Sequence, residues 1–369
     1  MRIECHAVSD KTETKCCCCS PEPDVVAEPQ AACCVDTNQS DAVPLDGERW
    51  IVGKVATPRG DVPVVATELT SADHIGAWKA RWGFGRMKYS IRPGLYAVGK
   101  PTPETPVFVS ANYRMSFDRL RAALPGVDGW LLVLDTRGIN VWCAAGKGTF
   151  GTDELVRQID ATQLGTIENH NKLVVPQLGA PGIAAHEVRK QSHFRIIYGP
   201  VRSEDIPAFL ESGMKATPEM RRVEFPLWDR LAVAPVELVM SAKYVLAIMV
   251  ALLLLAGLGA GGYSWSQVVG TGVWSAALFG FSFVAGAILT PALLPWLPGR
   301  AFSAKGVWIG LAVLLLAGGL MWMTPSASTN WLDVAAWCLL VPITTSFAAM
   351  NFTGATTYTS LSGVRQEMK

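Results

Sequence analysis

The sequence predicts an α/β domain with a largely parallel sheet, followed by an all-α multi-span transmembrane domain. Three observations lead to this prediction. From Trp50 to about Leu227, short apolar strand patterns alternate with helix patterns, which is typical of parallel sheets. Apolar runs then follow, each about the ~20 residues that a helix needs to cross a bilayer. No charged residue lies between Lys243 and Arg300.

Composition divides the 369 residues into successive segments. We expect a disordered, cysteine-rich tail over 1–48, because it is rich in polar residues and proline and has no apolar periodicity. The α/β domain is expected over 49–227, a connector helix over 228–242, the membrane domain over 243–352 and a cytoplasmic tail over 353–369. The net charge of +1 gives no reason to expect a nucleic-acid partner.

The alternating patterns predict these elements of the α/β domain in chain order. The strands are expected at Trp50–Val55, Val62–Ala66, Gly94–Val98, Val107–Ser110, Trp130–Asp135, Leu173–Pro176, Phe194–Tyr198 and Arg222–Phe225. The helices are expected at Ser116–Ala123, Thr152–Thr162, Ile183–Gln191 and Ser203–Ser212. In such sheets ligands bind beyond the carboxyl ends of the strands, so the loop after Asp135 is the first place to look for a site.

Four membrane spans are expected after the connector. They are Tyr244–Gly262, Val273–Leu297, Gly306–Met323 and Trp331–Met350. The second is expected to bend or break near Pro291 and Pro295, and a fifth span around Pro291–Pro298 stays open as an alternative. No span carries a central charge, which argues against a proton-coupled transporter.

The charges that flank the spans predict a single orientation in the inner membrane. The ends expected in the cytoplasm carry basic residues, whereas the connections Tyr263–Gly272 and Thr324–Asn330 contain no Lys or Arg. The basic residues are Lys243, Arg300, Lys305, Arg365 and Lys369. The positive-inside rule therefore places the N-terminal domain and the C-terminus in the cytoplasm.

The stretch Asn140–Gly148 is the most informative motif of the chain. It follows the strand Trp130–Asp135 across the turn Thr136-Arg137-Gly138. Asn is a favoured N-cap, worth ~1 kcal/mol, so Asn140 is expected to begin a short helix. Cys143 then lies in the first turn, where the helix dipole favours a thiolate.

The rest of this motif has small side chains and glycines. Ala144 and Ala145 have very small side chains, so we expect them to leave space for a large, flat cofactor against the helix. Gly146 and Gly148 are expected to end the helix. Trp142 is expected to be a packing anchor.

Three familiar motifs do not account for this stretch. Gly146–Gly151 formally matches GxGxxG, but it does not follow directly on the strand, and a single match is weak. A P-loop fails because Val141 and Gly148 stand where Gly and Ser or Thr are required. A zinc site is not expected, because Cys143 has no nearby Cys or His and the histidines show no ligand spacing.

The segment Asn140–Phe150 resembles the cap-helix motif of the corrinoid domain in the corrinoid iron–sulfur protein family of acetyl-CoA pathways. With the membrane domain attached, the chain over about 50–365 resembles the family of mercury-methylating corrinoid proteins. The resemblance implies a Rossmann-like fold and a cobalamin-type corrinoid, with its cobalt, bound base-off. The common histidine-on motif is absent, since Asp73-His74-Ile75-Gly76 has the wrong spacing. That absence agrees with a different lower ligand.

By this resemblance, the Cys143 thiolate is the lower axial ligand of cobalt and the catalytic residue. The cofactor-binding residues are expected to be Asn140, Val141, Trp142, Cys143, Ala144, Ala145, Gly146, Lys147 and Ser110. Lys147 is expected either to meet a corrin amide or to face solvent. Ser110 and Asn112, at the end of a strand, are expected either to reach the cofactor or to cap the turn.

The resemblance also implies a reaction and partners. A methyl group would pass from the corrinoid to Hg(II) and give methylmercury, and a strong anionic donor on cobalt supports such a transfer. The implied partners are a small ferredoxin with two [4Fe-4S] clusters as electron donor and a methyltetrahydrofolate-linked methyl donor. Two alternatives stay open: a corrinoid methyl carrier of one-carbon metabolism, and a membrane transporter or sensor of soft metals.

The cysteine-rich tail has two interpretations. Seven of the nine cysteines lie in this tail, and six of them crowd into residues 16–34: Cys16, Cys17, Cys18, Cys19, Cys33 and Cys34. Thiols of this kind suit thiophilic metals, so the tail could capture Hg(II). The alternative is a variable segment without a metal-binding role.

Overall fold

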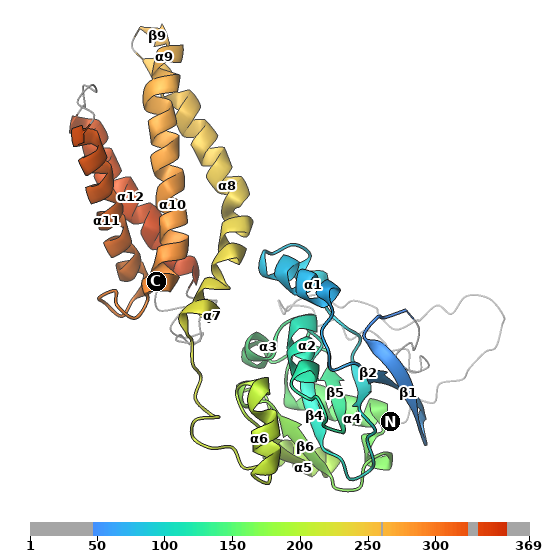
Figure 1. Cartoon of the computed structure of the whole chain (residues 1–369). Coiled ribbons are helices and arrows are strands. Elements are labelled where there is room, and N and C mark those ends of the chain that lie inside the picture. Colours follow the sequence, from blue (N-terminus) through green and yellow to red (C-terminus); the bar gives the residue numbers. More distant parts are fainter. Residues whose placement is uncertain (1–46, 260, 324–330, 353–369) are drawn as a thin grey trace, which may run out of the picture. The chain divides into compact units, whose positions relative to one another are not determined.

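The computed structural model describes residues 47–259, 261–323 and 331–352 (Figure 1). The cysteine-rich tail, with Cys16–Cys19, Cys33 and Cys34, lies outside the described residues, as does the tail over 353–369. The predictions for both tails therefore stay predictions. The described residues form a mixed sheet with helices on both faces and a set of long apolar helices.

The α/β part contains a seven-stranded sheet in the order β1-β2-β3-β5-β4-β6-β7. Its strands are β1 (Ile51–Thr57), β2 (Gly60–Val65), β3 (Gly94–Val98), β4 (Val107–Ala111), β5 (Gly129–Leu134), β6 (Lys172–Val175) and β7 (Arg195–Tyr198). The strands β5, β4, β6 and β7 are parallel to one another, whereas β1 pairs antiparallel with β2 and β3 with β5. The prediction of a largely parallel sheet is therefore confirmed for its central and C-terminal strands.

The helices of this part are α1 (Ser71–Arg81), α2 (Arg114–Ala122), α3 (Val141–Lys147), α4 (Thr152–Thr162), α5 (Ala185–Ser192) and α6 (Ile206–Glu211). Short 3₁₀ turns are η1 (Arg86–Lys88), η2 (Leu164–Thr166), η3 (Gln177–Gly179) and η4 (Ser203–Asp205). The predicted strand Arg222–Phe225 is wrong, because these residues form no strand pairing. Helix α1 was not predicted, although Thr70 and Asp73 form a capping box at its start.

Two apolar cores sandwich the sheet. Helices α3, α4 and α5 cover one face, and α2 and α6 cover the other. Side chains along a strand alternate between the two, as Leu131 and Leu132 of β5 do. The strands β3, β4 and β5 are buried along their whole length, which explains why they read as continuous apolar runs in the sequence.

A buried ionic network joins α1 to α2. The fully buried Arg121 donates to Asp118 at 2.8 Å and to Asp73 at 2.9 Å, and its Nη1 also donates to the carbonyl of Ala66 at 2.7 Å. Arg114 donates to the same two carboxylates, at 2.8 Å to Asp73 and 2.9 Å to Asp118 Oδ1. Two guanidinium groups thus balance two carboxylates, which is how buried charges are tolerated.

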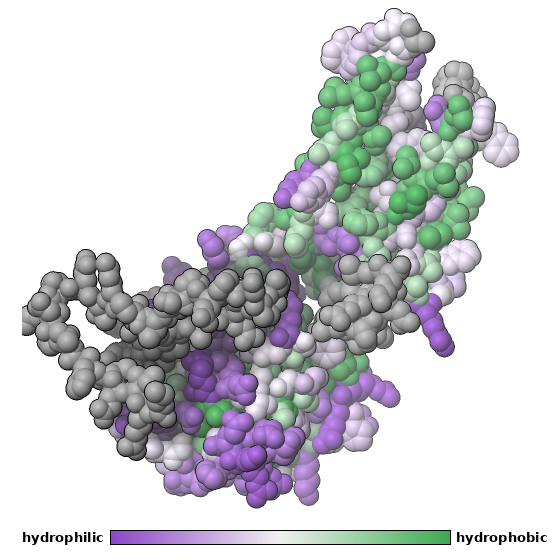
Figure 2. Space-filling view, turned by 180° about the vertical axis from the view of Figure 1, so that it is seen from behind, coloured by the Kyte–Doolittle hydropathy of each residue, from purple (hydrophilic) through white to green (hydrophobic). Residues whose placement is uncertain are grey.

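The apolar part of the chain is helical apart from one short hairpin, β8 (Leu258–Gly259) and β9 (Gly262–Tyr263). Its helices are α7 (Leu227–Leu231), α8 (Ala234–Leu255), α9 (Trp265–Gln267), α10 (Val273–Leu293), α11 (Phe302–Met323) and α12 (Trp331–Phe352), and a π-helical turn, Val268–Gly272, joins α9 to α10. Four helical segments in the described residues are long and apolar enough to span a membrane. Figure 2 shows apolar side chains over the outside of these helices. Leu315 of α11, for example, is 79% exposed. Such surfaces are suited to lipid.

Two predictions about this region need correction, and a third agrees in part. The connector and the first span are not separate, because α8 begins inside the predicted connector, after α7 and a turn, and runs unbroken into the first span. The second span was expected to bend or break near Pro291 and Pro295; Pro291 lies inside α10, as Pro342 lies inside α12, and α10 ends at Leu293, just before Pro295. A proline removes only its own N–H bond, and neighbouring helices can accommodate the change. The fifth span at Pro291–Pro298 is absent from the described residues, where α10 ends and turns follow.

Glycines let α11 approach α12 closely. A Cβ atom on Gly310 would lie 2.6 Å from the Cα of Pro342 and 2.6 Å from the Oγ1 of Thr345. Gly306 is equally tight, with the Cα of Ser346 at 2.6 Å. Small residues spaced four apart are a common device for packing helices in membranes.

Replacing Gly310 with valine is therefore expected to destabilise the helical part by about 1–3 kcal/mol, the usual cost of overpacking. The matched control is Gly318→Val on the same helix, where a Cβ would meet nothing within 4 Å. Thermal unfolding of the full chain in detergent micelles measures both. Equal unfolding temperatures for the two variants would contradict the tight α11–α12 contact.

Candidate functional site

The sheet has a topological switch point between β4 and β6. From β4 the chain passes to α2 on one face, and from β6 it passes to η3 and α5 on the other face. The loops therefore diverge at the carboxyl ends of these two strands, where open α/β sheets bind their ligands. A pocket of about 610 Å³ lies there, lined by Ser110, Tyr113, Val174 and Leu178 among others. Its size suits a cofactor rather than a bare ion.

Helix α3 begins at the edge of this pocket as predicted. The Asn140 side chain accepts a hydrogen bond from the backbone N–H of Cys143 at 2.9 Å, so the predicted N-cap is confirmed. Gly148 ends the helix with φ of 82°, in the left-handed region that favours glycine. Asn140, Val141, Trp142 and Cys143 line the pocket, and the thiol of Cys143 is free and half-buried.

Asn112 holds the loop that leads into α3. Its Oδ1 accepts hydrogen bonds from the backbone N–H of Thr136 (3.1 Å), the Thr136 hydroxyl (2.8 Å) and the N–H of Gly138 (2.9 Å). Its Nδ2 donates to Asp135 at 3.0 Å. The turn between Asp135 and Asn140 is thereby fixed, including Arg137 and Gly138, whose φ angles of 57° and 69° are positive. Of the two predictions for Asn112, capping the turn is the one observed.

The other predicted site residues fall into two groups. Ser110 is buried and lines the pocket. Ala144 and Ala145 lie in the core instead, because positions 141, 144 and 145 share the face of α3 that packs on the sheet. A Cβ atom on Gly182 would lie 3.1 Å from the Cα of Ala145, so small residues allow close packing here. Our interpretation of the alanines as clearance in the pocket is therefore replaced by core packing.

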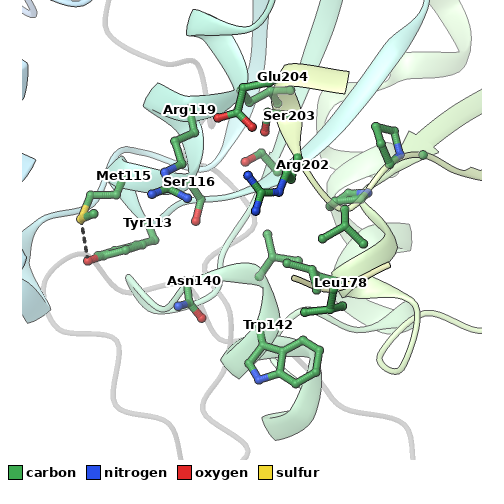
Figure 3. A pocket seen from close by; sticks show the side chains of 18 of the residues that line it. Tyr113, Met115, Ser116, Arg119, Asn140, Trp142, Leu178, Arg202, Ser203 and Glu204 are labelled. Carbon is green, nitrogen blue, oxygen red and sulfur yellow. Dashed lines mark hydrogen bonds between the residues drawn. The ribbon is translucent and has the colours of Figure 1, made fainter. Parts of the chain in front are cut away.

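Two residues of the motif are remote from the pocket lining. Gly146 and Lys147 are exposed and do not line it, so of the two alternatives for Lys147 the solvent-facing one is observed. Trp142, predicted as a packing anchor, is half-buried and lines the pocket. The α3 residues of the pocket therefore come from the first turn of the helix and its cap (Figure 3).

Sequence reasoning missed a tyrosine and four arginines of this pocket, of which Arg202 pairs with Glu224 and Asp229. Arg81 ends α1, Arg86 begins η1, and Arg119 lies on α2, and all three line the pocket with Tyr113. The Arg86 guanidinium lies 5.9 Å from the centroid of the Tyr113 ring. The Tyr113 hydroxyl donates to the sulfur of Met115 at 3.1 Å, as Figure 3 shows. No motif marks these residues, since they meet only after α1 folds against α2.

Basic and acidic side chains line the pocket around the phenol of Tyr113: Arg81, Arg86, Arg119 and Arg202, with Glu204, Glu224 and Asp229. Burial raises the pKa of Tyr113, and the nearby Cys143 acts in the same direction, against the pKa-lowering effect of the arginines. Tyr113 therefore stays protonated at neutral pH. In the described part of the chain, no three His, Cys, Asp or Glu side chains converge to hold a metal ion. Among the residues that line the pocket, Cys143 is the one thiol.

Fold and site together define a class: a doubly wound α/β domain with a cofactor-sized pocket at its switch point, in a chain with long apolar helices. Residues 85–210 match the family described as CO dehydrogenase/acetyl-CoA synthase delta subunit. This segment contains β4 to β7, α3 and most of the pocket residues, and it stops before the apolar helices.

Individual relatives cover the same region. The chain is 31% identical over 128 residues to acetyl-CoA decarbonylase/synthase complex subunit gamma of Archaeoglobus fulgidus. It is 32% identical over 130 residues to the subunit of the same name from Methanosarcina acetivorans. Each match takes in 34% of this chain and 27% of the relative, so the chain matches about a quarter of the length of these proteins. The similarity thus concerns the α/β domain with its pocket.

Proposed function

We propose that this chain is a membrane-anchored corrinoid protein that transfers methyl groups, with a cobalamin-type corrinoid in the switch-point pocket. The observation that carries the proposal is the free thiol of Cys143, held at the pocket by the Asn140 cap. The similarity of residues 85–210 to subunits of acetyl-CoA decarbonylase/synthase complexes supports it. So does the resemblance of the cap-helix motif to corrinoid domains.

The donor set of the pocket fits such a cofactor. A corrinoid needs one axial donor, a broad cavity and few other ligands, because the macrocycle supplies its own equatorial nitrogens. The pocket offers one thiol, Cys143, an apolar floor that includes Phe108 and Val109, and a volume of about 610 Å³. No histidine lines it. When bound, the corrinoid would supply a methyl group carried on cobalt.

The residues of the pocket would bind and orient the cofactor. The Asn140 amide fixes the backbone of Cys143, and Asn112 fixes the loop before it, so the thiol is presented without reorganisation. Cys143 lies in the first turn of α3, and a metal would bind it as the thiolate.

We infer that the methyl acceptor is Hg(II) and the product methylmercury. A thiolate ligand donates charge to cobalt, which suits transfer to an electrophilic metal. The apolar helices and the flanking charges support a multi-pass position in the inner membrane, with the α/β domain in the cytoplasm. A ferredoxin with two [4Fe-4S] clusters would return electrons, and a methyltetrahydrofolate-linked system would supply the methyl group.

A second function is favoured by the comparisons alone. The relatives are subunits of acetyl-CoA decarbonylase/synthase complexes, so the chain could carry methyl groups for carbon metabolism instead. The same pocket and cofactor would serve both functions. The third alternative, a membrane transporter or sensor of soft metals, needs no corrinoid. Uptake of cobalamin by the purified protein would therefore distinguish it from the two corrinoid functions.

The test uses the full chain, purified without oxygen in detergent. We expect it to take up one cobalamin, followed by its absorption spectrum, and to form methylmercury when methylated protein receives Hg(II). Failure to take up cobalamin would overturn the corrinoid proposal. Methyl transfer to a carbon acceptor but not to Hg(II) would assign the carrier function.

The hydrogen bond from Asn112 to Asp135, which anchors the loop before α3, can be tested by a single substitution and a compensating second one. Asn112→Asp retains the acceptor for Thr136 and Gly138 but sets two carboxylates against each other at Asp135. Methyl transfer is expected to fall about 10- to 100-fold, the usual effect of disturbing the support of a metal ligand. The exchange variant Asn112→Asp/Asp135→Asn restores a donor–acceptor pair and is expected to recover most of the rate. If the exchange variant transfers methyl groups no faster than Asn112→Asp, the hydrogen bond between residues 112 and 135 does not support the reaction.

A further inference from the structure

Three arginines in the pocket make no salt bridge with any carboxylate among the described residues. Arg81, Arg86 and Arg119 come from α1, η1 and α2 and line one region of the pocket around Tyr113. The acidic side chains of the same two helices, Asp73 and Asp118, are already engaged with Arg114 and Arg121. The pocket lining also contains Glu204, Glu224 and Asp229; Arg202 pairs with Glu224 at 3.6 Å and with Asp229 at 3.8 Å, and the charge of Asp229 also acts on Arg81. The carboxylates of α1 and α2 are thus engaged with other arginines, and Arg81, Arg86 and Arg119 make no ion pair of their own among the described residues.

The charges of the cluster act on one another. Burial, together with the charge of Arg119, lowers the pKa of Arg81, against the opposing effects of Tyr113 and Asp229. Tyr113 adds no negative charge, since burial keeps its phenol protonated. Like charges held together in a partly buried pocket are unfavourable unless an anion joins them. Guanidinium groups match phosphate oxygens particularly well, because they donate two parallel hydrogen bonds.

The cluster lies beside the predicted cobalt ligand. Tyr113 is near enough to all three arginines and to Cys143 for each to affect its pKa. Figure 3 shows Arg119, Tyr113 and Asn140 around the same space. In a cobalamin-type corrinoid, the nucleotide loop is attached on the side of the macrocycle from which a lower ligand binds. Its phosphodiester is an anion, whereas the amide side chains of the ring are uncharged.

We propose that Arg81, Arg86 and Arg119 form an anion subsite that binds the phosphodiester of the corrinoid's nucleotide loop. This inference rests on the proposed corrinoid function. The subsite and Cys143 would then fix the cofactor at two points, the phosphodiester and the metal. The arrangement selects complete corrinoids over those that lack the nucleotide loop.

The experiment compares two ligands on the full chain in neutral detergent. Cobalamin contains the phosphodiester and cobinamide lacks the whole nucleotide loop, so their affinities are measured by absorption titration. We expect wild-type protein to bind cobalamin about tenfold or more tightly than cobinamide, given the strength of charge-assisted hydrogen bonds. Arg119→Gln and Arg81→Gln are each expected to lose about tenfold in cobalamin affinity and none in cobinamide affinity.

The matched control is Arg189→Gln, which removes the same charge from an exposed site on α5 that does not line the pocket. It should leave both affinities unchanged. Inorganic phosphate is expected to weaken the binding of cobalamin and not that of cobinamide. A further measurement adds phosphatidylglycerol to the micelles. If this lipid lowers the affinities for cobalamin and cobinamide equally, and does so in the wild-type protein but not in the arginine variants, the arginines bind a lipid headgroup and the proposal is overturned.

The remaining outcomes separate this inference from the proposed function. If the wild-type protein binds neither corrinoid, the proposed function fails. If it binds both equally, or if the arginine variants keep the preference for cobalamin, the anion subsite is refuted while the corrinoid function stands.

Discussion

Replacing Cys143 with alanine is expected to abolish methyl transfer while leaving the fold and membrane insertion intact. The side chain is half-buried and makes no disulfide, so its removal costs little packing. The loss of rate should exceed the roughly 10- to 100-fold that follows when only the support of a metal ligand is disturbed. The rate of methylmercury formation measures it.

The absorption spectrum of bound cobalamin provides an independent measurement. In the wild-type protein, the proposed thiolate ligation should give a spectrum different from that of free cobalamin. The Cys143→Ala variant should still bind the corrinoid through the rest of the pocket, with the spectrum of a water-ligated form. The matched control is Cys338→Ala, which removes an exposed thiol from α12 and should change neither rate nor spectrum.

A Cys143→Ala protein with wild-type activity would refute the axial-ligand assignment. An inactive variant whose cobalamin spectrum equals that of the wild type would also count against it, because Cys143 would then act without touching cobalt.

Replacing Arg121 with methionine is expected to destabilise the α/β domain by about 3–5 kcal/mol, because it leaves two buried carboxylates, Asp73 and Asp118, with the single guanidinium of Arg114. Arg121 is 0% exposed and donates to Asp73, to Asp118 and to the carbonyls of Ala66 and Glu68. Methionine fills much of the same space, so the loss is chiefly electrostatic. Such a change is a large part of the total stability of an ordinary domain.

The measurement is the urea concentration at which the domain loses its resistance to pulse proteolysis in the full chain. The control is Arg157→Met on α4, where the arginine is exposed and pairs with Glu154 at 2.8 Å. A surface pair of this kind is worth at most about 1 kcal/mol. If both variants unfold at the same urea concentration, the ionic network between α1 and α2 does not stabilise the domain.

The strands and the cap helix were predictable because their signals are local. The strands β3 to β7 lie within a few residues of the predicted ranges, since each is a short apolar run between breakers. The cap by Asn140 follows from a side chain that meets a backbone N–H three residues later. The apolar helices were found by length and hydropathy, although α8 continues through the predicted connector.

The errors arose where tertiary packing decides. Helix α1 contains many polar and charged residues, and its place depends on Asp73 meeting two arginines 41 and 48 positions later. The alanines of α3 were assigned to the pocket, but the rotation of the helix turns them into the core. Pro291 was expected to bend or break the second span, yet it lies inside α10, which continues to Leu293.

The sequence by itself determined the α/β order, the apolar helices and the thiol at the start of α3, because each depends on residues close together in the chain. Only the tertiary structure decided which side chains surround that thiol. The strand order places β4 beside β6, and the ionic network brings α1 to α2, so that Arg81, Arg86 and Arg119 line one pocket with Cys143. Contacts between residues distant in sequence carry no local pattern, so they come only from the folded chain.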